Sequence, residues 1–155
     1  MMGENQPLAI HDGSGMRLAV VRARYNDHIT AGLLRGAEEY LQSAGAYYDV
    51  YEIPGAFELP LLAAELAEST YDAVIALGAV INGETDHYEH VAGRASEGLM
   101  RVALDSRKPI AFGILTVQEE EHAVTRSAPG PGNKGAEAAA AAVETVLVMR
   151  RIAGR

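Results

Sequence analysis

The chain has 155 residues, 48% of them apolar and 22% charged, and a formal net charge of −8 at pH 7. This length and composition predict one globular domain, and the negative charge argues against nucleic acid or an anionic membrane as the main partner. The absence of cysteine excludes disulfides, thiolate catalysis and thiolate-bound zinc, and it fits a cytoplasmic location.

The first 15 residues predict a flexible N-terminal arm that precedes a single domain over residues 16–155. This segment has no cationic region followed by an apolar one, so it does not resemble a signal peptide. No charge-free apolar run reaches 18 residues, and no membrane span is expected.

Extended apolar segments alternate with helical spacings along the rest of the chain. In chain order we expect a strand at 17–23, a helix at 29–42, a strand at 47–53, a helix at 59–67, a strand at 73–81, a helix at 87–104, a strand within 109–117, a helix at 118–126 and a helix at 134–151. This order predicts an α/β fold of the flavodoxin-like type, a three-layer αβα sandwich around a four-stranded parallel sheet.

The last expected helix is apolar nearly all round, with only Glu137 and Glu144 interrupting it before Arg150. A surface helix in a small domain normally has a wide polar face. A second apolar side indicates contact with another subunit. The alternative is that the small alanines simply pack closely on the sheet.

Three candidate site segments follow expected strands, at residues 25–27, 54–58 and 83–90. Since parallel strands all point the same way, these segments meet at one edge of the sheet, where ligands bind in open α/β sheets. A fourth candidate combines Arg126 with residues 133–135 across a Pro/Gly loop at 128–132.

His87 is the general acid–base candidate, because imidazole titrates near neutral pH. The alternative is a solvent-exposed histidine at the start of a helix. Glu84 and Thr85 stand where the unpaired N–H groups of a helix N-terminus suit a phosphate, although Thr85 can equally be a plain N-cap.

Arg126 and Lys134 can together hold an anion, or Arg126 can form a surface salt bridge with one of Glu119, Glu120 and Glu121. Phe57 can stack on a planar ligand, although a phenylalanine is more often a core residue. A metal site from Asp86, His87 and His90 has weak support, since the zinc-protease helix spaces its histidines by four.

Four segments in register resemble the lumazine synthase family: IPGAFELP at 53–60, LGAVINGETDHYEHVA at 77–92, PIAFGILT at 109–116 and NKGAEAA at 133–139. The similarity runs from about Leu18 to Met149. It implies condensation of 5-amino-6-(D-ribitylamino)uracil with 3,4-dihydroxy-2-butanone 4-phosphate in riboflavin biosynthesis, with no metal and no organic cofactor.

The resemblance also implies residue roles. His87 would transfer protons, and the butanone phosphate would be held by Glu84, Thr85, Arg126 and Lys134. The pyrimidine and ribityl groups would contact Tyr25, Ala56, Phe57, Glu58, Ala79, Val80, Ile81 and Phe112. Phe112 would reach the pocket of a neighbouring subunit, so each site would lie at an interface of a homo-oligomer.

The chain departs from the family pattern at several positions. Asn82 stands where arginine is usual, Tyr25 where phenylalanine is commoner, and His122 and Thr125 replace a glutamine and a glutamate. The loop at 128–132 replaces one that usually contains lysine. These changes leave open the choice among a pentamer, a decamer and an icosahedral shell, although the short spacing from Arg126 to Lys134 is typical of shell-forming members.

The resemblance further implies riboflavin synthase as a partner or cargo. A non-catalytic relative that binds lumazine or flavin, or that only forms a shell, is the alternative. An unrelated flavodoxin-like binder of a phosphorylated ligand is a third interpretation.

Overall fold

The computed structural model describes residues 6–83 and 87–154 of the chain. In chain order the elements are β1 (Arg17–Ala23), α1 (Asp27–Ala44), β2 (Tyr47–Ile53), the 3₁₀ helix η1 (Ala56–Glu58), α2 (Leu59–Ala67), β3 (Ala73–Ile81), α3 (His87–Ser106), β4 (Ile110–Val117), α4 (Glu120–Ser127) and α5 (Lys134–Ile152).

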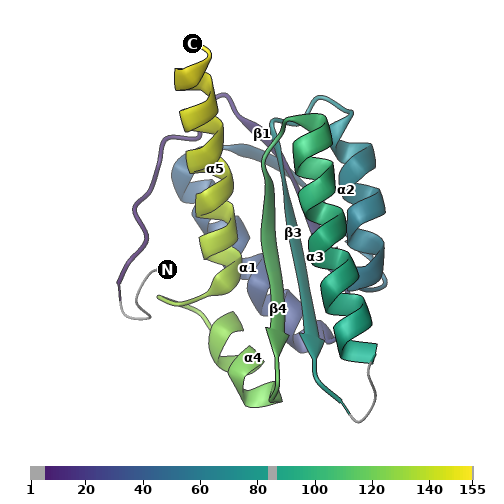
Figure 1. The fold of residues 1–155 in the computed structure, drawn as a ribbon. Coiled ribbons are helices and arrows are strands. Elements are labelled where there is room, and N and C mark those ends of the chain that lie inside the picture. The colour runs from purple at the N-terminus through teal and green to yellow at the C-terminus, as the bar shows by residue number, and fades with distance from the viewer. Residues whose placement is uncertain (1–5, 84–86, 155) are drawn as a thin grey trace.

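The strands form one four-stranded sheet in the order β2-β1-β3-β4, and every neighbouring pair is parallel. The carboxyl ends of all four strands therefore lie at the same edge of the sheet (Figure 1). The predicted α/β sandwich and its four-stranded parallel sheet are confirmed.

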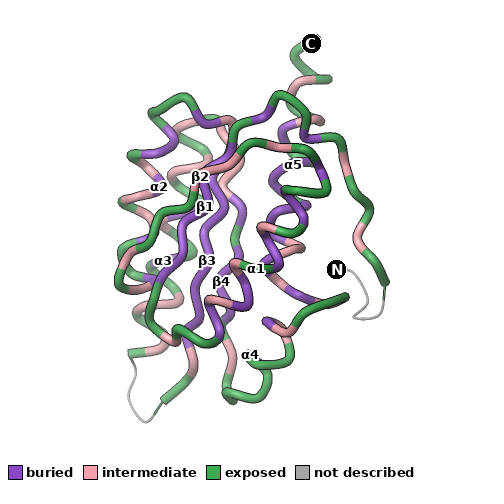
Figure 2. Tube along the Cα trace, turned by 180° about the vertical axis from the view of Figure 1, so that it is seen from behind, coloured by how far each residue is buried: buried purple, intermediate pink, exposed green. Residues whose placement is uncertain are grey.

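Helices cover both faces of the sheet, which gives the three layers (Figure 1). One core cluster packs α1 and α5 against Leu18, Val20 and Ile75, and a second packs α2 and α3 against Val21 and Val74. Figure 2 shows the buried residues concentrated along β1 and β3 and on the inward sides of the helices. The central strand β3 is buried from Ala73 to Val80, as a parallel strand covered on both faces requires.

The boundaries of β1, β2, β3 and α2 agree with the sequence-based expectation, while the other helices differ at their ends. The helix α1 begins two residues early, at Asp27, because Asn26 adopts a left-handed conformation (φ 64°) that ends the preceding turn. Gly45 (φ 74°) terminates the same helix after Ala44. The 3₁₀ helix η1 was not expected.

The helices α1 and α5 cross closely through glycine. A Cβ atom added to Gly135 would lie 1.9 Å from the Leu33 carbonyl oxygen. The buried Asn133 caps α5 by accepting from the Ala136 amide, and its Nδ2 donates to the Gly32 and Ser127 carbonyls. The start of α5 is thereby fixed against α1.

The inner side of α5 is buried against the sheet and α1. The alanines of this side pack closely there, as the alternative interpretation of the helix predicted. Val148, Met149 and Ile152 nevertheless keep 37%, 38% and 79% of their surface exposed within this chain. An apolar strip toward the end of α5 is therefore left uncovered by the protomer itself.

Part of the predicted arm lies against the body of the domain. The Tyr40 hydroxyl donates to the Ala9 carbonyl and accepts from the His11 amide, while His11 Nε2 lies 3.3 Å from Glu144 Oε2. In the described part of the chain, no helix combines the length and apolarity that crossing a membrane requires.

Candidate active site

A pocket of about 630 Å³ opens at the carboxyl ends of β1, β2 and β3, beside the start of α3. It brings together described residues from each of the three segments that the sequence placed at one edge of the sheet. The described lining residues are Tyr25, Asn26, Pro54, Gly55, Ala56, Phe57, Glu58, Ala79, Val80, Ile81, His87, His90 and Val91.

Two aromatic side chains stand at this pocket largely uncovered, Tyr25 with 74% and Phe57 with 59% of its surface exposed. The core interpretation of Phe57 is therefore wrong. An exposed ring costs hydrophobic free energy unless a partner covers it, and a planar heteroaromatic ligand is such a partner.

Backbone hydrogen bonds join the first two pocket segments. The amides of Arg24 and Tyr25 donate to the carbonyls of Ile53 and Pro54 at 2.8 and 2.9 Å. The Asn26 amide side chain reaches across to β3 and donates to the Ala79 carbonyl at 2.9 Å. The β1–α1 turn is thus tied to both neighbouring parts of the pocket.

The segment after β2 is ordered by its own short helix. Glu58 Oε1 accepts from the Gly55 amide at 3.0 Å, which closes the turn of η1, and Ala56 is buried beneath it. This geometry leaves the Phe57 ring on the pocket side rather than in the core.

The helix α3 contributes His87, His90 and Val91 to the pocket. Spacings of three and four residues place side chains on the same face of a helix, so this pattern in the sequence could have added His90 and Val91 to the expected lining. Glu84, Thr85 and Asp86, predicted for phosphate or metal binding, lie outside the described residues.

A second pocket of about 400 Å³ lies beside β4, between the end of α4 and the start of α5. Phe112, Arg126 and Lys134 line it, together with Thr116 and Glu137. Among the described residues, the two pockets share no lining residue. The structure therefore separates Phe112, Arg126 and Lys134 from the predicted site residues that line the first pocket.

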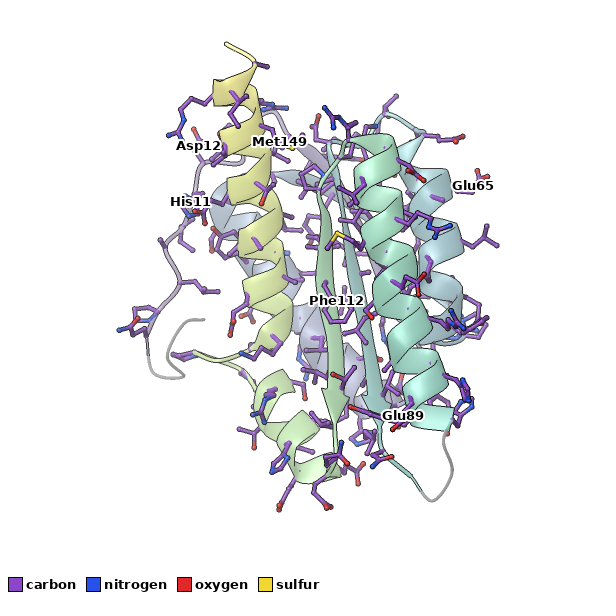
Figure 3. The ribbon with its side chains drawn as sticks, viewed as in Figure 1. His11, Asp12, Glu65, Glu89, Phe112 and Met149 are labelled. Carbon is purple, nitrogen blue, oxygen red and sulfur yellow. The ribbon has the colours of Figure 1, made fainter. Side chains whose placement is uncertain are left out.

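The cations of the second pocket are held by their own helices. Arg126 Nη1 donates to the His122 carbonyl at 3.1 Å, and Lys134 Nζ lies 3.1 Å from Glu137 Oε2. Glu120, one candidate partner for Arg126, instead lies 2.9 Å from His28 Nε2. Phe112 stands in front of β4, between α5 and α3, with 48% of its surface exposed (Figure 3).

Two of the departures from the family pattern occupy defined places near these pockets. Asn82, just after β3, donates through Nδ2 to Gln118 Oε1, just after β4, at 2.5 Å. The backbone carbonyl of His122 is the acceptor for Arg126. Asn82 thus joins the ends of β3 and β4, whereas His122 makes its contact within α4, and neither residue lines the first pocket.

The first pocket combines aromatic and aliphatic walls with two imidazoles, and the second combines an aromatic ring with two cations. The first suits a planar ligand that exchanges protons, and the second suits an anion. Within residues 6–83 and 87–154, no group of three or more His, Asp or Glu side chains is arranged to hold a metal ion.

Residues 15–150 match the family model described as 6,7-dimethyl-8-ribityllumazine synthase. Curated relatives carrying that name include proteins of Nitratidesulfovibrio vulgaris strain DP4 (48% identity, covering 91% of this chain and 93% of the relative) and Clavibacter michiganensis subsp. michiganensis (46%; 92% and 91%). The relative from Leifsonia xyli subsp. xyli is 42% identical over 99% of this chain and its own full length. The chain therefore belongs to the 6,7-dimethyl-8-ribityllumazine synthase family.

Proposed function

We propose that this protein is an enzyme that condenses 5-amino-6-(D-ribitylamino)uracil with 3,4-dihydroxy-2-butanone 4-phosphate to form 6,7-dimethyl-8-ribityllumazine. The observation that carries the proposal is the first pocket, in which exposed aromatic rings and His87 lie together at one strand edge. The identity of the substrates is inferred from the family. The pocket offers aromatic walls for a flat ring and an imidazole for proton transfer.

The pyrimidine lies between the rings of Tyr25 and Phe57 in this proposal. Its ribityl chain extends along the backbone and side chains of Ala56, Glu58 and residues 79–81. Glu84 and Thr85 meet the phosphate of the second substrate.

The reaction needs proton transfers more than it needs a strong nucleophile. The 5-amino group of the pyrimidine attacks the ketone carbonyl and forms an imine with loss of water. Elimination then breaks the C–O bond to phosphate, and the resulting enol tautomerises. The ribitylamino nitrogen closes the second ring with loss of another water.

His87 accepts and returns protons during these steps, and general acid–base catalysis of this kind contributes roughly 10²–10⁴-fold to a rate. Holding two substrates in one pocket supplies much of the remaining acceleration. No metal or organic cofactor takes part in the proposed chemistry.

The complete site forms between neighbouring copies of the chain. Phe112, Arg126 and Lys134 line a separate pocket of the same protomer, and a rotational assembly brings that pocket of one copy against the first pocket of the next. Phe112 then covers the pyrimidine, and the two cations meet the phosphate. A pentamer is the smallest such assembly we propose, and an icosahedral shell is the larger one.

The remaining parts of the proposal concern cellular context. The enzyme is cytoplasmic, residues 16–155 form its single domain behind the arm at 1–15, and riboflavin synthase consumes its product as a partner or cargo. Neither nucleic acid nor a membrane is a partner, in keeping with the net charge of −8.

The test is to incubate purified protein with both substrates and follow lumazine fluorescence. We expect product only when both substrates and the protein are present. Fluorescence from added lumazine that binds without any turnover would identify a non-catalytic lumazine-binding relative instead. Absence of both turnover and binding would refute the proposed function.

A further inference from the structure

Arg22 is a buried cation in a strand whose other residues after Arg17 are all apolar. It retains 9% exposure, while every other residue of β1 after Arg17 is an alanine, leucine or valine exposed by 1% or less. A guanidinium loses much hydration on burial, so its position requires compensating partners. Arg22 lines neither pocket, so its role is inferred from the groups that it contacts.

All three guanidinium nitrogens of Arg22 are occupied, each by a different group. Nε donates to Thr30 Oγ1 at 3.1 Å, and Nη1 to Glu52 Oε2 at 2.9 Å. Nη2 donates to the Asp27 carbonyl at 3.3 Å and to the Asp27 carboxylate. One side chain therefore ties β1 to the end of β2 and to the first turn of α1.

These partners directly flank two walls of the first pocket. Asp27 follows Tyr25 and Asn26, and Glu52 lies two residues before Pro54, where the second pocket segment begins. Asn26, between these two walls, has a left-handed φ of 64°, a conformation that asparagine tolerates better than most L residues and that turns the chain from β1 into α1.

We propose that Arg22 is a positioning residue of the pyrimidine pocket. Its guanidinium fork holds the β1–α1 turn against the end of β2, so that the rings of Tyr25 and Phe57 keep a fixed separation before substrate arrives. The kinetic consequence of this inference rests on the proposed function, whereas the hydrogen bonds of the guanidinium fork are independent of it. Lysine, with one nitrogen on a flexible stem, cannot replace three directed donors.

The chain offers a matched control at the other end of the same strand. Arg17 also joins β1 to β2, with Nη2 3.4 Å from Asp49 Oδ2, and its guanidinium carbon lies 5.0 Å from the Tyr71 ring centroid. It is far along β1 from the pocket segments and lines neither pocket. Arg17→Met therefore removes a more exposed arginine–carboxylate pair between the same two strands without touching the turn.

The kinetic test compares Arg22→Met, Arg22→Lys and Arg17→Met with the wild type. We expect both Arg22 variants to raise the KM for the pyrimidine substrate about tenfold, with kcat and the KM for the phosphorylated substrate within about twofold. Arg17→Met should leave all three constants unchanged. Wild-type constants in Arg22→Lys, or equal effects on both KM values, would overturn the proposal.

Amide hydrogen exchange tests the same role without activity. In both Arg22 variants we expect the Arg24 and Tyr25 amides, which donate to Ile53 and Pro54, to exchange at least about tenfold faster, and in Arg17→Met to keep wild-type rates. Unchanged exchange in both Arg22 variants would refute the positioning role even if the wild type formed no lumazine. If Arg22→Met does not fold, Arg22→Lys and Asp27→Asn carry both measurements.

Discussion

At the scale of single residues, side chains of the same type have different surroundings in the structure, although the sequence alone does not distinguish them. His87 and His90 both line the first pocket, whereas His122 offers its backbone carbonyl to Arg126 and lines neither pocket. Phe57 is exposed at the pocket, although a phenylalanine after a strand would ordinarily enter a core. Exposure and neighbours, more than residue type, identify the groups available to a substrate.

His87→Ala should slow turnover more than it weakens binding, because a proton shuttle acts on the transition state. We expect kcat to fall roughly 10²-fold or more while both KM values change only a few-fold. Steady-state lumazine formation measures this, with Tyr88→Phe, a neighbouring residue outside the pocket lining, as the control. Unchanged turnover would remove His87 from the mechanism.

Arg126→Ala should chiefly abolish use of the phosphorylated substrate. Loss of a hydrogen bond between charged groups costs about 1.5–3 kcal/mol, which corresponds to a rise of roughly 10- to 150-fold in the KM for that substrate. Titrating each substrate at a saturating concentration of the other separates the two effects. An unchanged KM for the phosphorylated substrate would contradict the anion role.

At the scale of elements, the contact between α1 and α5 depends on the absence of a side chain at Gly135. The Leu33 carbonyl that a Cβ would meet belongs to the helix backbone and cannot rotate away. Lys134, which lines the second pocket, is the first residue of α5. The β1–α1 turn, which lines the first pocket, leads directly into α1. The way α1 packs against α5 therefore affects the position of lining residues in both pockets.

Gly135→Ala should destabilise the protein by at least about 2 kcal/mol, because backbone must move to admit the methyl group. Gly93→Ala is the control, since a Cβ there meets nothing within 4 Å. Alanine in an exposed helix should be neutral or stabilising by about 0.5–1 kcal/mol. Urea unfolding compares the two variants, and equal stabilities would argue against the close crossing.

The outer strand β2 makes a polar cluster with the segment before β3, and this cluster makes stability depend on pH. The hydrogen bond from the Tyr71 hydroxyl, with lesser help from Tyr47 and Arg17, holds the pKa of Asp49 below its ordinary value. A carboxylate with a lowered pKa stabilises the fold above its unfolded pKa of about 4, and that contribution is lost as pH falls through the folded pKa.

Asp49→Asn should therefore flatten the acid limb of the stability curve. Between about pH 5 and pH 2, the free energy of unfolding should fall less steeply in the variant than in the wild type. Tyr71→Phe should act in the same direction, because it removes the largest cause of the shift. Urea titrations at several pH values measure both slopes, and identical slopes would exclude a role for this carboxylate.

At the scale of the whole molecule, the predicted site residues that the structure describes line two separate pockets of one chain. His87 and Arg126 line separate pockets, although the proposed chemistry needs them on one small molecule. The apolar strip of Val148, Met149 and Ile152 is also left exposed by the single chain. In the proposed assembly, contact between identical copies brings the two pockets together and covers the apolar strip.

Mixed oligomers of His87→Ala and Arg126→Ala subunits should regain activity that neither variant has alone. If each site takes His87 from one subunit and Arg126 from its neighbour, random mixing restores about a quarter of the sites. Co-expression followed by the fluorescence assay measures the recovery. No recovery, with mixing verified by mass spectrometry, would show that both groups act within one subunit.

The sequence by itself determined the periodic structure. Alternating apolar runs and helical spacings predicted β1, β2, β3 and α2 to the residue, because hydrophobic period is a local property of the chain. The parallel arrangement of the four strands followed too, since strands that alternate with helices form parallel sheets, whereas the strand order was not predicted. The convergence of residues 25–26, 54–58, 87 and 90 on one pocket is a consequence of that parallel arrangement.

Only the tertiary structure decided how distant groups meet. The separation of Arg126 from His87, the exposure of Phe57 and the partners of Arg22 depend on how helices cross and where turns end, which no local pattern encodes. Arg22 in particular looks like an isolated polar residue within a strand until Thr30, Asp27 and Glu52 are brought around it. Packing in three dimensions assigns a buried charge its partners, and therefore its role.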